Sequence, residues 1–145
     1  GQSAVGLVDD IGVEKFLIAS AVRSIMAQRL GRSVCPDCGA PSELSEKDIL
    51  ALHLTPDQTA KADIMMGSGC NSCRMTGYKG RIGLFEIFNI NEEIRMLING
   101  DEPTSGLRKR ARETGMRTLR EDGVRKVLAG RTTAAEVLRV TMADT

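Results

Sequence analysis

Cys35-Pro-Asp-Cys38-Gly39 and Cys70-Asn-Ser-Cys73 are the two stretches that decide the fold of this chain. Each stretch is a CxxC pair, which places two thiolates on one side of a tight loop, and a spacer of 31 residues separates the pairs. Structural zinc sites use four soft ligands arranged as a tetrahedron. The two pairs therefore predict one structural zinc ion bound by Cys35, Cys38, Cys70 and Cys73. We expect Gly39 to adopt a positive φ that turns backbone N–H groups toward the sulfurs.

Three other uses of these cysteines remain open. A rubredoxin-like iron site has the same ligands, but such sites usually have more aromatic packing than this chain, with 3% aromatic residues, supplies. Two disulfides would need an oxidising compartment, and nothing marks the chain as secreted. A thioredoxin-type redox pair would need one CxxC at the start of a helix that follows a strand.

The composition predicts a globular protein with a mainly aliphatic core. The chain has 145 residues, of which 41% are hydrophobic, and no Trp. This is enough for one domain or for two small lobes. No run of 18 apolar residues and no secretory leader pattern occurs, so the sequence predicts neither a membrane span nor secretion. We therefore expect a cytoplasmic location.

The first 30 residues read as two helices. The first is expected from Ser3 to Gly12, and the second from Val13 to Leu30, with Gly31 directly after its end. The second helix is apolar on more than one face, so it needs to be covered on several sides. We expect that the chain is a piece of a larger protein that supplies this cover.

The remaining segments predict short helices and one strand. Capping-box patterns at Ser45 and Thr55 predict two short helices between the cysteine pairs. A buried strand is expected over residues 81–90, followed by helices over 91–100, 103–115 and 118–130 and a last helix from Thr133. The predicted fold is an α-rich α+β class, with a zinc-stabilised small lobe containing a short buried strand and a C-terminal helical subdomain.

No catalytic constellation is apparent. His53 is the only histidine, and we interpret it as a helix-end or surface residue and not as a metal ligand, since a Cys₃His site would leave one cysteine unused. No Gly-Lys dipeptide occurs, which rules out a Walker A loop within this sequence. We expect no catalytic and no nucleotide-binding residue here.

A strongly basic segment lies near the C-terminus. Residues 106–131 contain 9 basic and 3 acidic side chains, a local charge of 9 − 3 = +6. One hypothesis is nucleic-acid binding by an independent zinc-ribbon protein, but no aromatic residues alternate with the basic ones for base stacking. A face complementary to acidic patches on a neighbouring subunit is the interpretation that we favour. The basic residues are Arg108, Lys109, Arg110, Arg112, Arg117, Arg120, Arg125, Lys126 and Arg131.

Three longer motifs together resemble a known family. They are Ala27-Gln-Arg-Leu30 shortly before the first cysteine pair, Cys70-Asn-Ser-Cys-Arg-Met-Thr-Gly-Tyr-Lys-Gly-Arg-Ile-Gly-Leu-Phe-Glu86, and Gly115-Met-Arg-Thr-Leu-Arg-Glu-Asp-Gly-Val-Arg-Lys-Val-Leu-Ala-Gly130. In this order they resemble the C-terminal part of the secretion ATPases of the GspE/PilB type, and the likeness covers nearly the whole chain.

The resemblance implies a fragment of a hexameric ATPase of type II secretion or type IV pilus assembly. Residues 1–33 would then be the C-terminal helices of a truncated RecA-like motor domain, 34–90 the tetracysteine zinc-binding subdomain, and 91–145 the terminal helical subdomain. ATP and Mg²⁺ would bind only to the full-length parent, so this fragment should be inactive alone. The implied partners are neighbouring subunits and inner-membrane platform or adaptor proteins, with the protein peripheral to the inner membrane and no nucleic acid bound.

Overall fold

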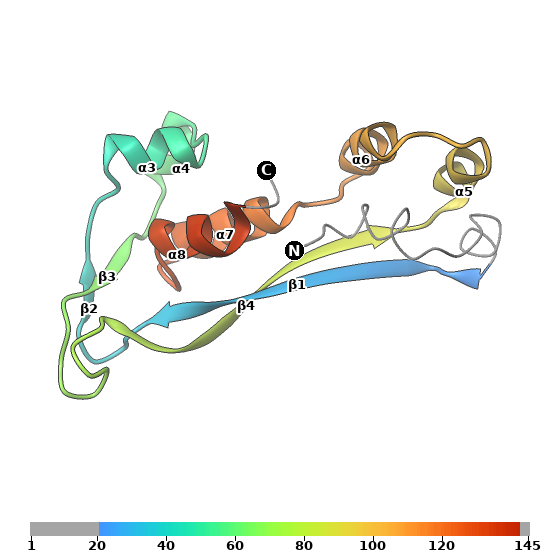
Figure 1. Cartoon of the computed structure of the whole chain (residues 1–145). Helices are drawn as coiled ribbons and strands as arrows, with labels where there is room; N and C mark the ends of the chain where they lie inside the picture. Colours follow the sequence, from blue (N-terminus) through green and yellow to red (C-terminus); the bar gives the residue numbers. More distant parts are fainter. Residues whose placement is uncertain (1–20, 143–145) are drawn as a thin grey trace. The chain divides into compact units, whose positions relative to one another are not determined.

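The computed structural model describes residues 21–142, which form helices and two small sheets (Figure 1). The described residues fall into two compact units, one comprising residues 29–84 and 120–142 and the other residues 21–28 and 85–119. In chain order the elements are β1 (Ser24–Val34), β2 (Gly39–Pro41), α3 (Glu46–Ala51), α4 (Pro56–Ala60), β3 (Met65–Gly67), β4 (Tyr78–Asn89), α5 (Glu92–Asn99), α6 (Thr104–Glu113), α7 (Leu119–Leu128) and α8 (Ala134–Thr141).

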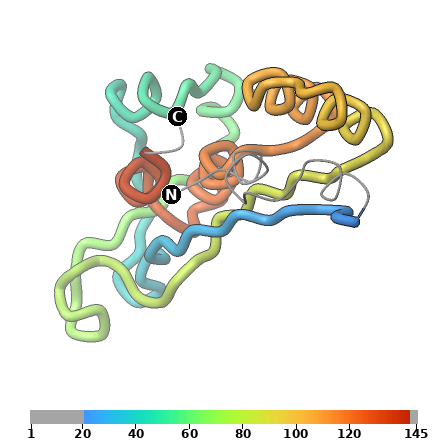
Figure 2. Tube along the Cα trace, turned by 45° about the vertical axis from the view of Figure 1, so that its right-hand side comes forward, coloured from blue at the N-terminus to red at the C-terminus, as the bar shows by residue number. Residues whose placement is uncertain are grey.

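The two long strands, β1 and β4, pair with each other and run in opposite directions (Figures 1 and 2). The backbone N–H of Cys35, directly after β1, donates to the carbonyl of Gly77, directly before β4, with an N···O distance of 2.9 Å. Every second residue of β4 is buried from Ile82 to Phe88, while Phe85 and Ile87 are 37% and 48% exposed. The predicted strand over 81–90 is therefore confirmed, but only one of its faces is buried.

The prediction of a helix from Val13 to Leu30 is wrong for the part that the structure describes, because Ser24–Leu30 belongs to β1. Ala27 and Gly31 are buried, whereas Met26 and Leu30 are more than half exposed, so burial alternates as in a strand. The apolar residues fit both helical and strand spacing, and pairing with the distant β4 decides between them. Gly31 accordingly lies inside a strand. The expected helix from Ser3 to Gly12 and residues 13–20 lie outside the described residues.

The two short strands β2 and β3 form a sheet, here called the β2–β3 neck, that connects the cysteine pairs to the two short helices between them. The strands β2 and β3 are antiparallel, with Gly39 opposite Gly67 and Pro41 opposite Met65. This small sheet was not predicted. Beyond it, α3 and α4 start where the sequence predicts, with Ser45 accepting from the backbone N–H of Asp48. Thr55 and Gln58 form the complete capping box at α4.

The helices of the C-terminal half begin close to their predicted positions. In one unit, Asn91 caps α5 by accepting from the N–H of Ile94, and α5 packs against α6. In the other unit, Gly123 of α7 allows close packing, because a Cβ atom there would lie 2.6 Å from Val137 of α8. None of the helices within residues 21–142 has the length and apolar content needed to span a membrane.

Candidate metal centre

The ends of all four strands bring the cysteines together. Cys35 directly follows β1, and Cys38 directly precedes β2. Cys70 and Cys73 lie in the loop between β3 and β4. The four Sγ atoms all lie within 4.8 Å of one another, and Cys35 and Cys73 are buried. Pairing of β1 with β4 and of β2 with β3 thus places residues from distant parts of the sequence in one cluster.

The distances between the sulfur atoms fit a tetrahedral metal site. They are 3.9 Å for Cys35–Cys70, 3.8 Å for Cys38–Cys73 and 3.7 Å for Cys70–Cys73. A regular tetrahedron with metal–sulfur bonds of about 2.3 Å has edges of roughly 3.8 Å. A disulfide would bring two sulfurs to about 2.05 Å, so all four thiols are free in this structure. Four thiolates in this arrangement could hold a soft ion such as zinc, and iron would accept the same donors.

Backbone N–H groups point at two of the sulfurs. The N–H of Gly69 donates to Cys38 Sγ at 3.3 Å, and Cys73 Sγ accepts from Cys70 at 3.3 Å and from Gly77 at 3.2 Å. Such bonds stabilise thiolates and orient them for a metal. The pattern differs from the sequence prediction, because Gly69 and Gly77 have the positive φ values, +101° and +82°.

The role predicted for Gly39 is therefore wrong. Gly39 has no positive φ and its N–H donates to the carbonyl of Cys35 at 2.8 Å. A glycine is still required there, because a Cβ atom would lie 2.6 Å from that same carbonyl oxygen. The left-handed residues of the site lie instead in the second loop, where Arg74 and Met75 have φ values of 55° and 65°.

The hydrogen bonds act differently on the pKa values of Cys38 and Cys73. Burial raises the pKa of Cys38, and the single N–H of Gly69 does not offset this effect. Burial also acts to raise the pKa of Cys73, but the N–H groups of Cys70 and Gly77 outweigh it, so that the pKa is lowered. Metal binding requires thiolates, which the hydrogen bonds to Cys73 Sγ favour.

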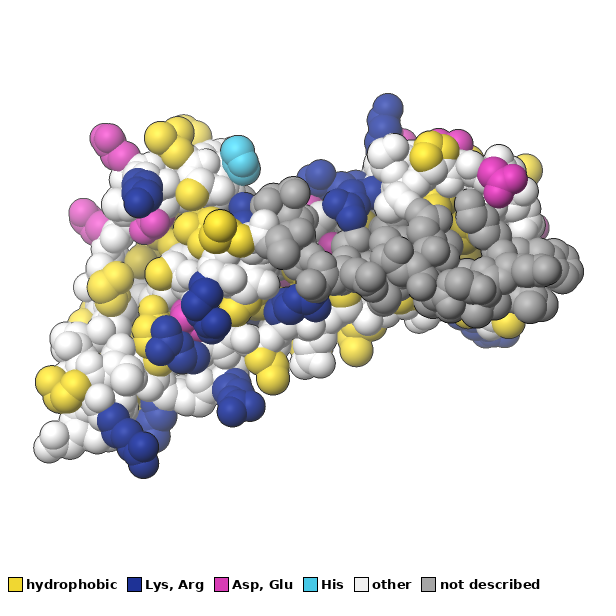
Figure 3. Space-filling model, in the orientation of Figure 1, with side chains coloured by type: hydrophobic (Ala, Val, Ile, Leu, Met, Phe, Trp, Pro, Cys, Tyr) yellow, Lys and Arg dark blue, Asp and Glu magenta, His cyan; other side chains and the backbone are white. Residues whose placement is uncertain are grey.

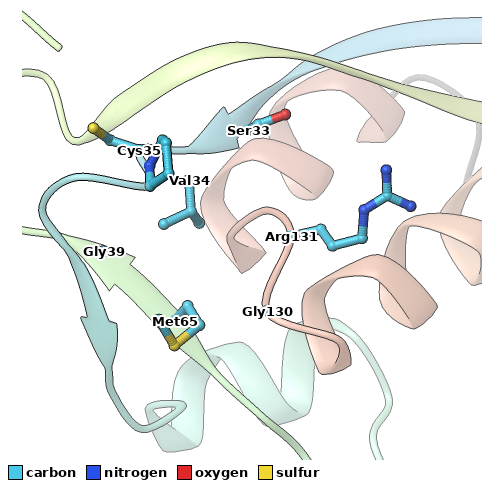
Figure 4. Close-up of a pocket in the computed structure, with 8 residues that line it drawn as sticks. Ser33, Val34, Cys35, Gly39, Met65, Gly130 and Arg131 are labelled. Carbon is cyan, nitrogen blue, oxygen red and sulfur yellow. The ribbon is translucent and has the colours of Figure 1, made fainter. Parts of the chain in front are cut away.

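A shallow hollow lies beside the cysteine cluster. Its volume is about 320 Å³, and Figure 4 shows the sulfur of Cys35 and the guanidinium of Arg131 directed away from it. Its walls are backbone and apolar side chains, so it offers no set of convergent charged groups for a ligand. The lining residues are Ser33, Val34, Cys35, Pro36, Gly39, Met65, Gly130 and Arg131.

The other candidate residues lie away from the thiols. His53 has a φ of 54°, is exposed and directly follows the C-cap of α3, as predicted for a helix-end residue. Several cations of the basic segment form ion pairs within their own unit. Arg110 binds Glu93 and Glu113, and Lys126 binds Asp122 at 2.6 Å. These pairs reduce the charge available to a nucleic acid.

Comparison with protein families identifies the family of the chain that carries this cysteine cluster. The model of a family described as Type II/IV secretion system protein matches residues 2–139. The chain belongs to this secretion system family. It is 38% identical to type II secretion system protein E of Aeromonas hydrophila, over 99% of this chain and 28% of that protein. The resemblance noted from the cysteine and glycine motifs is thereby confirmed.

Relatives from pilus assembly are equally similar within this secretion system family. The chain is 37% identical to the type IV pilus assembly ATPase TfpB of Acinetobacter baylyi, over 95% of this chain and 24% of that protein. It is also 37% identical to the type IV pilus assembly ATPase PilB of Thermus thermophilus, over 96% of this chain and 16% of that protein. The chain thus spans between about a sixth and a little over a quarter of these three relatives' length.

Sequence reasoning missed a polar cluster between β1 and α8. Thr133-Ala-Ala-Glu136 reads as a capping box, and Thr133 does accept from the N–H of Glu136. The Glu136 side chain, however, is 2% exposed and accepts from Arg32 and Arg139. The signal in the sequence is that Glu136 directly precedes the apolar residues Val137 and Leu138 of the last predicted helix.

Proposed function

We propose that this chain is the zinc-stabilised assembly and coupling region of a secretion or pilus-assembly ATPase. The observation that carries the proposal is the convergence of four thiols, within 4.8 Å of one another, in a chain of this family. Cys35, Cys38, Cys70 and Cys73 would hold the ion. Zinc has no redox chemistry of its own, so it would act here by holding the fold together.

The metal would act through the free energy of folding. It ties the two ends of a 31-residue spacer to each other and to the start of β4. Structural zinc contributes on the order of 10 kcal/mol that the unfolded chain does not gain. We therefore propose that residues 34–90 depend on the ion for their shape, and that residues 91–145 form the helical subdomain.

The proposed setting is a hexameric, cytoplasmic ATPase at the inner membrane. Neighbouring subunits and inner-membrane platform or adaptor proteins would contact this region. The names of the relatives, a type II secretion system protein and a type IV pilus assembly ATPase, fit such a setting. The nucleotide would bind elsewhere in the parent protein, so this chain would not hydrolyse ATP by itself.

Metal analysis tests the proposal directly. We expect about one zinc per purified chain by mass spectrometry of the metal content. We also expect loss of the far-ultraviolet circular dichroism of the folded state after chelation or in Cys70→Ser. Ser68→Ala is the control, because Ser68 is exposed and two residues from a proposed ligand. A chain that lacks zinc, or whose fold is unchanged after chelation, contradicts the proposal.

An activity assay tests the second part. The zinc-loaded chain alone is expected to release no phosphate from ATP above the buffer background. ATP hydrolysis that remains with the chain through purification and exceeds that of a no-protein control would place nucleotide chemistry within these residues. This result would overturn this part of the proposal.

A further inference from the structure

Arg32 on β1 and Arg139 on α8 share one buried carboxylate. The backbone N–H and Nη2 of Arg32 donate to Oε2 and Oε1 of Glu136, each at 2.8 Å. From the other side, Nε and Nη2 of Arg139 donate to Oε1 and Oε2 at 3.0 and 2.8 Å. A carboxylate can accept about four hydrogen bonds. Glu136 is therefore saturated by these two residues.

Neighbouring groups fix the position of Arg32. Its guanidinium carbon lies 4.2 Å from the centre of the Tyr78 ring, a favourable cation–π distance. The ring is itself held, because the hydroxyl of Tyr78 lies 2.7 Å from Thr133 Oγ1. The carbonyl of Arg32 accepts from Thr132 Oγ1 at 2.7 Å. Both the backbone and the side chain of Arg32 are thus held before any partner binds.

The two guanidinium groups still face solvent. The Arg32 and Arg139 side chains are 49% and 57% exposed, in contrast to the 2% exposure of Glu136. Basic side chains gather around an acidic one over the end of β1 in Figure 3. Nε and Nη1 of Arg32 and Nη1 of Arg139 have no acceptor among the residues that the structure describes.

The charges in this cluster do not cancel. One arginine neutralises one carboxylate, and the second leaves an excess charge of 2 − 1 = +1 at the surface. Glu136 raises the pKa of Arg32, and the nearby positive charge of Arg139 opposes that rise, so the two cations repel each other. The burial of Glu136 is balanced by hydrogen bonds from both arginines. The excess positive charge and the unused N–H groups nevertheless face solvent, where they can meet a further acceptor.

We propose that Arg32 and Arg139 form a docking site for a carboxylate side chain in an acidic segment of a partner protein. A single carboxylate would neutralise the excess charge and match the planar N–H edges that remain. A phosphate with two or more charges would leave the cluster negative beside Glu136, so the charge balance favours the carboxylate. This site lies outside the four cysteines and adds a recognition surface to the proposed assembly role.

A short capped glutamate peptide with a fluorescent label is the probe for this site. Fluorescence anisotropy with the full zinc-loaded chain is expected to detect binding at low salt that weakens as salt is added. Affinity is expected to fall on the order of tenfold in Arg32→Gln and in Arg139→Gln, because each substitution removes one cation and its N–H donors from a half-exposed site. Arg117→Gln is the matched control, since it removes one exposed cation at another position.

A measurement on the unmodified chain keeps the test independent of folding defects. The Nε–H resonances of Arg32 and Arg139 are expected to shift during the peptide titration, while that of Arg117 stays in place. Absence of binding at low salt, an equal loss of affinity in Arg117→Gln, or unchanged Arg32 and Arg139 resonances would overturn the proposal. Stronger shifts of both resonances by inorganic pyrophosphate than by the peptide would assign the site to phosphate and overturn it as well.

Discussion

Arg32 and Glu136 are 104 positions apart in the sequence, and two hydrogen bonds of 2.8 Å join them. In one bond the donor is the backbone N–H of Arg32, so that β1 itself is held against α8. In the other bond the donor is the guanidinium group. Because β1 leads directly into Cys35, the first cysteine pair is attached to α8 through a buried charge. The stability of this region should therefore respond to the protonation of Glu136.

The first prediction concerns pH. Hydrogen bonds from Arg139 and Arg32 lower the pKa of Glu136 by more than burial raises it, so that the pKa falls from 4.5 to about 2. A lowered pKa in the folded state means that the stabilisation is present above the ordinary pKa and is lost as the pH falls toward 2. The free energy of unfolding should decrease by up to about 3 kcal/mol over this range because of Glu136.

Chemical denaturation at several pH values checks this prediction. The metal is expected to dissociate in acid, so the wild-type chain and Glu136→Gln are compared with zinc bound, and only at pH values at which both retain the ion. The difference between their free energies of unfolding should be constant well above pH 4.5 and should begin to shrink as the pH approaches that value. A difference that does not change with pH would exclude the ion pair as its source.

A second prediction concerns Gly130, in the turn between α7 and α8. It has a φ of +77°, and a Cβ atom there would lie 2.5 Å from the carbonyl oxygen of Asp63 and 2.7 Å from Met65. Gly130→Ala should cost about 2–3 kcal/mol. Gly80→Ala is the control for backbone strain alone, because φ is +85° and the space around it is open. Equal losses in thermal unfolding would show that the contact with Asp63 is unimportant.

A third prediction compares two helix caps. Thr133 accepts from the N–H of Glu136 and also bonds Tyr78, whereas Ser45 only accepts from Asp48 at an exposed position. Thr133→Ala should therefore cost about 2 kcal/mol and Ser45→Ala about 0.5–1 kcal/mol in the free energy of unfolding. The order of the two denaturation midpoints checks this, and a reversed order would contradict it.

A fourth prediction is a stabilising substitution at Arg74. This residue has a φ of 55°, in the left-handed region, where side chains are strained and glycine is not. Arg74→Gly should raise the free energy of unfolding by about 0.5–1 kcal/mol. Lys47→Gly, another exposed cation but inside α3, should instead lower it by about 1 kcal/mol. If Arg74→Gly also lowers the melting temperature, the side chain makes a contact that outweighs the strain.

Local signals in the sequence predicted the parts of the fold that depend on nearby residues. The helix starts at Thr55 and Asn91 are confirmed because a cap is made within three positions. The CxxC spacing likewise indicated that the four thiols would converge. The helix expected over Ser24–Leu30 failed because its true partner, β4, lies about 50 positions further along the chain.

The contacts of Glu136 and the backbone of the cysteine loops could not be predicted in the same way. Whether Glu136 closes a capping box or binds Arg32 depends on β1 lying beside α8, which the local pattern does not encode. The left-handed glycines of the cysteine loops were also missed, because the positions of Gly69 and Gly77 relative to the sulfurs follow from the β2–β3 neck.

The β2–β3 neck has a consequence for engineering and for divergence among homologues. Pro41 lies opposite Met65, and the N–H of Ser42 donates to the carbonyl of Ile64. The segment of residues 42–64, which contains α3 and α4, therefore begins and ends at the same place. The length of this segment can therefore change without changing the distances between the sulfur atoms. The exposed His53, between α3 and α4, offers a graft point for a tag or a reporter domain, and insertions at this position can accumulate without moving a thiol.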